Sequence, residues 1–89
     1  MRAVITVIGK DMVGILAKVS AVCAKYNVNI MDVTQTIMQD MFAMIMMTDI
    51  SKANVPFSTL QDELTALGDE LGLAIHTMHE DIFNSMHRI

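Results

Sequence analysis

The first third of the chain joins a short apolar run to a segment with helical periodicity. Residues 3–8 are rich in β-branched side chains and end at a glycine, which predicts a strand. The following apolar residues recur at the spacing of one helix face: Met12, Ile15, Leu16, Val19, Val22, Cys23 and Tyr26. Asn27 tolerates the left-handed conformation that ends helices. The pattern therefore predicts a strand, a turn, and a helix that ends near Tyr26 and Asn27.

The middle third predicts a β-hairpin. Residues 28–38 and 41–49 both have strand composition, and Gln39 and Asp40 form the tight turn between them. The first strand alternates imperfectly, with Met31, Val33 and Ile37 on one face and Ile30, Asp32, Thr34 and Thr36 on the other. Such a strand suits a sheet edge, whereas the second strand is apolar on both faces and suits the centre of a sheet.

The last third predicts a second helix, a fourth strand and a helical tail. Pro56 suits the first position of a helix, and one apolar stripe follows at Phe57, Leu60, Leu64, Leu67 and Leu71. Gly72 is expected to end this helix, and residues 73–79 have strand composition. Beyond them, the apolar residues share one helical face: Ile82, Phe83, Met86 and Ile89.

The element order β-α-β-β-α-β predicts an α+β protein with a ferredoxin-like fold. Right-handed crossovers place both helices on one face of a four-stranded antiparallel sheet, with the strands that contain Val4 and Met44 at its centre. No helix from the first 79 residues covers the other face of the sheet. We therefore expect the tail or a second subunit to cover it, and we divide the chain into a domain of residues 1–80 and a tail of residues 81–89.

The turn of residues 9–15 is the best candidate binding site. Gly9 permits a turn with positive φ, Asp11 is suited to capping the helix, and Gly14 allows another backbone or a ligand to come close. Free amides at a helix N-terminus favour small anions such as carboxylates and phosphates. The alternative is that these residues only make a tight connection. The turn has neither the dinucleotide fingerprint nor the phosphate-loop motif.

The amino-acid composition limits the classes of molecule that the protein is expected to bind. At 53% hydrophobic, the chain is rich in apolar residues for its 89 residues, yet no run is long enough to span a membrane, so we expect a subunit interface. The net charge of −4 and the few aromatic residues disfavour nucleic-acid binding. The N-terminus does not have the layout of a signal peptide, and the single cysteine, Cys23, suits a buried thiol. These features predict a cytoplasmic protein.

Groups that could support catalysis or bind a metal are scattered, so we expect no enzyme, no cofactor and no metal. His76 and His79 project to opposite faces of a regular strand, and Cys23 belongs to a core face. A metal site of His79, Glu80 and His87 would require the tail to fold back. Five of the ten methionines lie between residues 38 and 47, where an adaptable apolar surface is favoured over a soft-metal site.

Four segments together resemble the ACT domain, a small regulatory ligand-binding module. They are residues 7–11, 14–17, 26–30 and 42–44, and the similarity extends over about the first 80 residues. The chain is most similar to the short stand-alone ACT proteins of uncharacterised function that are related to the glycine-cleavage repressor. Residues 79–83 and 86–89 strengthen this assignment.

The resemblance implies dimerisation and amino-acid binding at the dimer interface, by the first loop and the start of the second strand. It carries ligand contacts over to Gly9, Lys10, Asp11, Met12, Val13, Gly14, Ile15, Asn29 and Ile30. Many ACT loops carry Arg-Pro where this chain has Met12 and Val13.

The sequence and its resemblance to ACT domains are compatible with two functions. In the first, a homodimer or higher homo-oligomer binds an amino acid or similar anion and regulates an unidentified protein partner. In the second, the chain is a dimerisation or protein-interaction module with no small-molecule ligand.

Overall fold

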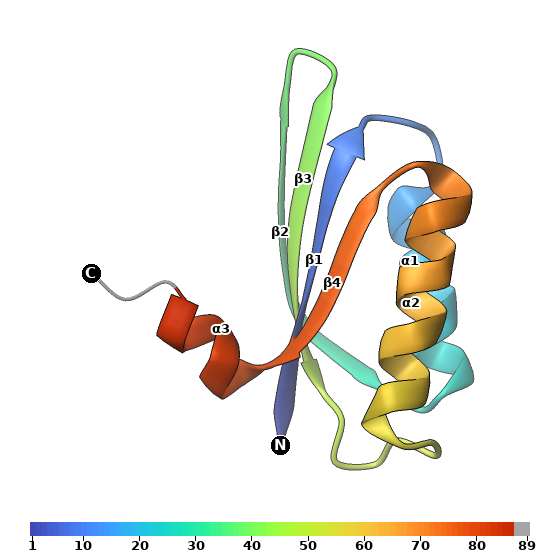
Figure 1. Cartoon of the computed structure of the whole chain (residues 1–89), viewed down its shortest axis with the longest axis vertical. Helices are drawn as coiled ribbons and strands as arrows, with labels where there is room; N and C mark the ends of the chain where they lie inside the picture. The colour runs from blue at the N-terminus through green and yellow to red at the C-terminus, as the bar shows by residue number, and fades with distance from the viewer. Residues whose placement is uncertain (87–89) are drawn as a thin grey trace.

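Four antiparallel strands form one sheet in the order β2-β3-β1-β4, and helices lie on both of its sides (Figure 1). The computed structural model describes residues 1–86. The elements in chain order are β1 (Arg2–Lys10), α1 (Ile15–Lys25), β2 (Asn29–Met38), β3 (Met41–Asp49), α2 (Phe57–Leu71), β4 (Ala74–His79) and α3 (Glu80–Met86). This arrangement confirms the predicted βαββαβ ferredoxin-like fold, with β1 and β3 central. Within residues 1–86, no helix is long and apolar enough to cross a bilayer.

The core lies between the sheet and the pair α1 and α2, which cover one face (Figure 1). Ile5 and Val7 of β1 pair with Met46 and Met44 of β3, and all four side chains are buried. The helices meet them with Ile15, Val19 and Cys23 of α1 and Leu60 and Leu64 of α2. Alternation along the strands therefore directs one apolar set toward the helices, and it directs the other set to the opposite face.

The start of β2 differs from the predicted alternation. The register shifts between Ile30 and Asp32, so Ile30 lies opposite Thr48 and Val33 lies opposite Met46. Both Ile30 and Val33 pack against the core, whereas the simple alternation placed them on opposite faces. An inserted residue in one strand reverses the face of every residue before it, which explains the error.

Gly9 has a different role from the predicted one. It lies inside β1, and Gly14 and Gly72 are the glycines with positive φ in the described chain. A Cβ on Gly9 would lie 2.5 Å from Cδ2 of Leu73, so the glycine allows β1 to pass close to the residue before β4. The prediction of a turn at Gly9 was therefore wrong, whereas Gly72 ends α2 in the left-handed conformation as predicted.

The C-terminal helix α3 lies on the side of the sheet opposite α1 and α2 (Figure 1). Two contacts join the Arg2 guanidinium to the Glu80 carboxylate, at 3.0 Å and 2.6 Å, and tie the start of α3 to β1. Val4 is fully buried on this face, whereas Ile8, at the far end of the same strand, is 50% exposed. The helix thus covers one end of the second face. Ile89 and His87 lie outside the described residues, and the boundary between residues 80 and 81 stays a prediction.

We expect Gly68→Ala to destabilise the fold. Alanine normally stabilises a helix relative to glycine by up to about 1 kcal/mol. Here, however, the added Cβ would lie 2.7 Å from the Leu73 carbonyl oxygen and 3.0 Å from Cγ1 of Ile75. The overpacking should lower the free energy of unfolding by roughly 1–3 kcal/mol in urea titrations. Thr65→Ala, at an exposed position of the same helix, is the matched control and should not lower stability. Equal stability of Gly68→Ala and wild type would show that α2 moves freely against β4.

Candidate functional site

The predicted loop is a short connection held between two strands and a helix. Residues 11–13 leave β1, and the amide of Asp11 donates to the carbonyl of Asp40 in the β2–β3 turn at 2.8 Å. Gly14 is the N-cap of α1 and has φ of 90°. A side chain there would be strained, although nothing lies nearer to the Cβ position than Cε of Lys18 at 4.0 Å. Space beside Gly14 is therefore open.

The first turn of α1 has amides without a capping side chain. Asp11 was expected to cap the helix, but no side chain donates or accepts a capping hydrogen bond there, so this prediction was wrong. The first amide bonded within the helix is that of Lys18, which donates to Gly14 at 3.0 Å. The amides of residues 15–17 precede it and point out of the helix end, where they favour an anion.

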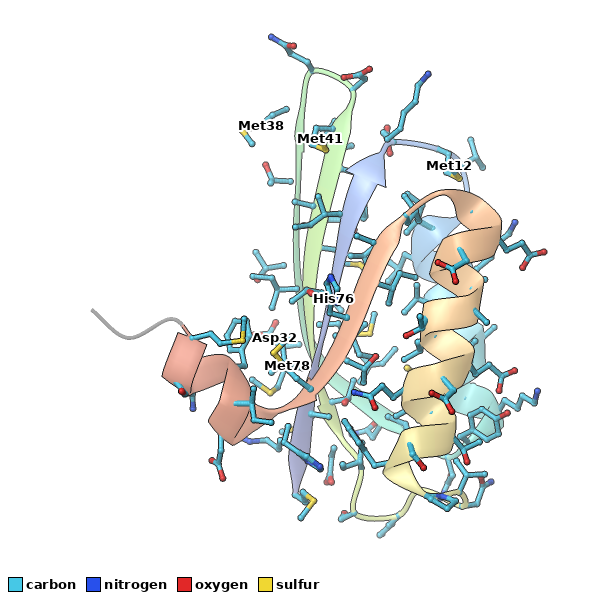
Figure 2. All side chains as sticks on the ribbon, viewed as in Figure 1. Met12, Asp32, Met38, Met41, His76 and Met78 are labelled. Atoms are coloured by element: carbon cyan, nitrogen blue, oxygen red, sulfur yellow. The ribbon has the colours of Figure 1, made fainter. Side chains whose placement is uncertain are left out.

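The side chains around these amides are mostly exposed. Val13 is almost fully exposed, and Met12 is partly exposed on the loop (Figure 2). Ile15 is buried in the core, so that only its backbone faces the loop. Lys18 brings a positive charge to Gly14 from one helical turn away. The loop therefore combines backbone donors with a nearby cation.

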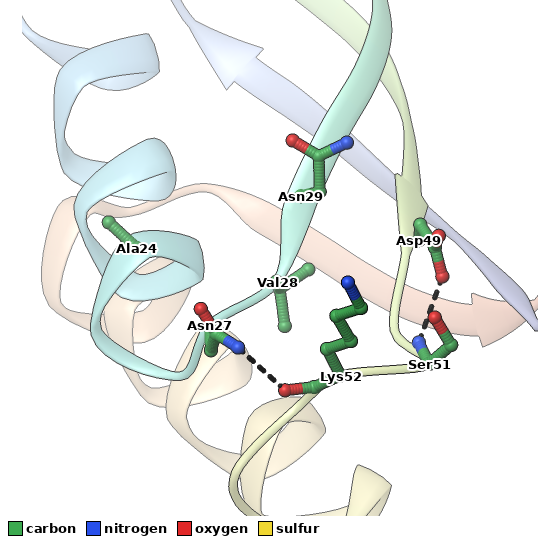
Figure 3. Close-up of a pocket in the computed structure, with 7 residues that line it drawn as sticks. All are labelled: Ala24, Asn27, Val28, Asn29, Asp49, Ser51 and Lys52. Atoms are coloured by element: carbon green, nitrogen blue, oxygen red, sulfur yellow. Dashed lines mark hydrogen bonds between the residues drawn. The ribbon is translucent and has the colours of Figure 1, made fainter.

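The other predicted contacts, Asn29 and Ile30, lie at the start of β2. Here a pocket of about 210 Å³ opens between the C-terminal end of α1, the start of β2 and the end of β3 (Figure 3). Asn29 lines it, whereas Ile30 packs partly against the core. The pocket is lined by Ala24, Asn27, Val28, Asn29, Asp49, Ser51 and Lys52.

Local hydrogen bonds hold the polar wall of this pocket. The Asn27 side-chain amide donates to the Lys52 carbonyl at 2.9 Å, and the Ser51 amide donates to the Asp49 carboxylate at 2.9 Å (Figure 3). Hydrogen bonds from Ser51 hold the pKa of Asp49 below its ordinary value of 3.8. Asp49 is therefore ionised at neutral pH beside the Lys52 ammonium, and the wall presents charges of both signs.

Within one chain, the two groups of predicted contacts lie apart. Residues 9–15 precede α1, whereas Asn29 and Ile30 follow it (Figure 1). A helix of the 11 residues of α1 is about 16 Å long. The structure thus brings residues 9–15 together at one end of the molecule, and it places Asn29 and Ile30 at the other end.

Other reactive side chains have structural partners. The His79 ring stacks on Phe57 at a centroid distance of 4.1 Å, and Glu80 pairs with Arg2. His76 lies on the opposite face of β4 from His79, as predicted, and His87 lies outside the described residues. Residues 1–86 contain no group of three His, Cys, Asp or Glu side chains that could hold a metal ion.

The sequence profile of the ACT domain matches residues 2–78. The chain belongs to the ACT domain family. ACT domains are regulatory modules that bind small molecules. A UPF0237 protein of Methanocaldococcus jannaschii is 54% identical over 88 residues, which cover 99% of this chain and 98% of that protein.

Solved structures give the same assignment. An ACT domain protein from Streptococcus pneumoniae superposes with a TM-score of 0.79 at 37% identity, over 93% of each chain. A protein assigned as a glycine cleavage system transcriptional repressor has a TM-score of 0.72 at 23% identity, and the match covers 85% of this chain and 43% of that one. The latter shows the fold alone. The resemblance to short stand-alone ACT proteins is thereby confirmed.

Sequence reasoning missed part of the polar surroundings of the site. Lys18 follows Gly14 by four residues, and this helical spacing was a usable signal. Asp49 and Lys52 gave no such signal, because their nearness to Asn29 depends on the pairing of β2 with β3 and on the loop after β3.

We expect native labelling of Cys23 by a thiol reagent to be slow. The side chain is fully buried, and burial raises its thiol pKa from 9.0 to about 11. A raised pKa means that the reactive thiolate is rarer in the folded protein at every pH below about 11. The labelling rate of folded protein should keep rising with pH up to about 11, whereas urea-unfolded protein should level off near pH 9. Equal rates in the two states at pH 8 would contradict the position of α1.

Proposed function

We propose that this ACT protein is a homodimeric regulatory module that binds an amino acid or similar small carboxylate between its two subunits. The loop of residues 9–15 comes from one subunit, and Asn29 and Ile30 come from the other. The separation of these two segments by the length of α1 carries the proposal. A single chain leaves half of the expected contacts out of reach of the loop, and a second copy supplies them.

The edge of the molecule formed by β2 and α1 suits such a dimer. β2 is an edge strand, so one side of it has no strand partner within residues 1–86. Beside it, α1 exposes the small side chains Ala17, Ala21 and Ala24, which permit close helix packing, and a shallow hollow joins them to Asn29. If two β2 edges pair antiparallel, the two α1 helices also run antiparallel. The loop at the start of one α1 then approaches Asn29 at the end of the other.

The two halves of this site suit the two ends of an amino acid. The free amides of the first turn of α1 and the Lys18 ammonium favour the carboxylate of the ligand. Lys18 supplies the positive charge that many ACT loops carry as arginine where this chain has Met12 and Val13. On the other subunit, the side-chain carbonyl oxygen of Asn29 and the Asp49 carboxylate can accept hydrogen bonds from the ligand ammonium.

Regulation rather than catalysis fits the chemistry of these residues. Lys18, Asn29 and Asp49 bind and orient a ligand, but no nucleophile with an adjacent base accompanies them in residues 1–86. A ligand that bridges the subunits stabilises the dimer, because it binds only the assembled form. A partner protein that recognises the dimer would then respond to the ligand concentration.

A mixing experiment tests the shared site. Calorimetry against each of the twenty amino acids first identifies those that bind. Gly14→Val should then abolish binding through strain at φ 90°, and Asn29→Ala should weaken it at least tenfold. The two variants are then unfolded together and refolded. A heterodimer of the two has one site that carries both substitutions and one site that carries neither. Random pairing should therefore restore about a quarter of wild-type sites.

The variants alone and a mixture without exchange are the controls, with circular dichroism to verify folding. Unrestored binding in the exchanged mixture would place both segments in one subunit and overturn the shared site. If none of the twenty amino acids releases or absorbs heat, the second function, an interaction module without a small-molecule ligand, replaces the first.

A further inference from the structure

The pocket at the C-terminal end of α1 contains a cation that has no role in the proposed function. The Lys52 side chain extends from the loop after β3 toward the space between Asn29 and Asp49 (Figure 3). Neither Lys52 nor Asp49 takes part in an ion pair within residues 1–86. An ammonium without a counter-ion is available to an anionic group of a ligand.

Hydrogen bonds to the end of α1 hold the loop that carries Lys52. The Lys52 carbonyl accepts a hydrogen bond from the Asn27 side chain at 2.9 Å (Figure 3). Two residues later, the Asn54 amide donates to the Tyr26 carbonyl at 3.1 Å. The backbone of Lys52 is therefore held beside the pocket, and only its side chain needs to move to reach a ligand.

We propose that the ligand is an acidic amino acid, aspartate or glutamate, and that its side-chain carboxylate binds the Lys52 ammonium. This inference rests on the proposed function, in which Lys18 and the free amides of one subunit bind the α-carboxylate and Asp49 of the other subunit binds the ammonium. Lys52 lines the same pocket as Asp49. A ligand held there by its ammonium therefore extends its side chain toward Lys52.

The charges of the completed site match those of an acidic amino acid. The site has two ammonium groups, on Lys18 and Lys52, and one carboxylate, on Asp49. At neutral pH an acidic amino acid has the reverse set, two carboxylates and one ammonium. A neutral ligand would leave the Lys52 ammonium unpaired between two subunits, and burial of an unpaired charge is costly. A basic ligand would place a second cation against Lys52.

The size and lining of the pocket agree with a short acidic side chain. The pocket volume of about 210 Å³ is that of about seven water molecules in the liquid. The side chains of aspartate and glutamate reach their carboxylates through one or two methylene groups. Ala24 and Val28 line the apolar part of the pocket and suit these methylene groups, whereas Lys52 suits the carboxylate at their end.

Calorimetry with pairs of amino acids that differ in one charge tests the inference. Aspartate has nearly the shape of asparagine, and glutamate has nearly that of glutamine, so each pair differs mainly in the charge at the end of the side chain. Wild-type protein should bind each acid at least tenfold more tightly than its amide, because hydrogen bonds between charged groups are about twice as strong as neutral ones. Free lysine and arginine should bind more weakly than either amide.

Substitutions of Lys52, which is exposed, test its role directly. Lys52→Met keeps most of the side-chain length and removes the charge, so it should lower the affinity for both acids at least tenfold and change the affinity for both amides less than twofold. Lys52→Glu should reverse the preference, so that free lysine and arginine bind more tightly than the acids. Lys25→Met removes the same charge outside the pocket, where Lys25 pairs with Glu63 at 2.9 Å, and this control should keep the wild-type preference.

The acid preference and the shared site fail in different ways. Equal affinity of wild-type protein for the acids and their amides would overturn the role of Lys52, and so would an acid preference that Lys52→Met leaves unchanged. In both cases an amino acid still binds, and the mixing experiment with Gly14→Val and Asn29→Ala still tests the shared site. If none of the twenty amino acids binds, the proposed function fails, and the acid preference fails with it.

Discussion

A sheet has two faces, and this chain has only two long helices to cover them. Helices α1 and α2 lie on the same face, as the general preference for right-handed crossovers leads one to expect. The central strands β1 and β3 nevertheless carry apolar side chains on both faces, because Val4 and Ile45 alternate with Ile5 and Met44. The α1 and α2 layer buries one set completely. The other set is buried at the end that α3 covers, where Val4 has no exposed surface, and Ile8 and Ile45 stay about half exposed.

Most of the fold follows from local patterns that act within a few residues. The bounds of β3 and the turn at Gln39 were predictable, because apolar runs and turn residues alternate clearly there. The bulge near Ile30 was not, because an inserted residue has no compositional mark and is recognised only from the partner strand. Gly9 was misread for a related reason. Its close neighbour, Leu73, is distant in the sequence, and glycine composition alone cannot distinguish a turn from a close packing contact.

The candidate site was also predictable only where its residues are close together in the sequence. Residues 9–15 are contiguous, so their loop and the free amides at the start of α1 can be inferred from spacing. The surroundings of Asn29 combine α1, β2 and the loop after β3, so Asp49 and Lys52 become neighbours only after the sheet has formed. The resemblance to ACT domains supplied Asn29 and Ile30, and the structure then placed them at the end of α1 remote from the loop.

Two surfaces of this small protein leave different groups without a partner in the described residues 1–86. At the edge, β2 leaves backbone hydrogen-bonding groups unpaired beside small side chains of α1, and such groups are satisfied by pairing with another strand. On the second face of the sheet, Ile8 and Ile45 leave apolar surface exposed, and removing such surface from water is favourable. Strand pairing at the edge would be directional and would position polar ligand contacts within a narrow range, whereas burial of the second face would depend mainly on its area. A ligand bound between the subunits would therefore act on the pairing of the β2 edges, because the strength of that pairing depends on its geometry.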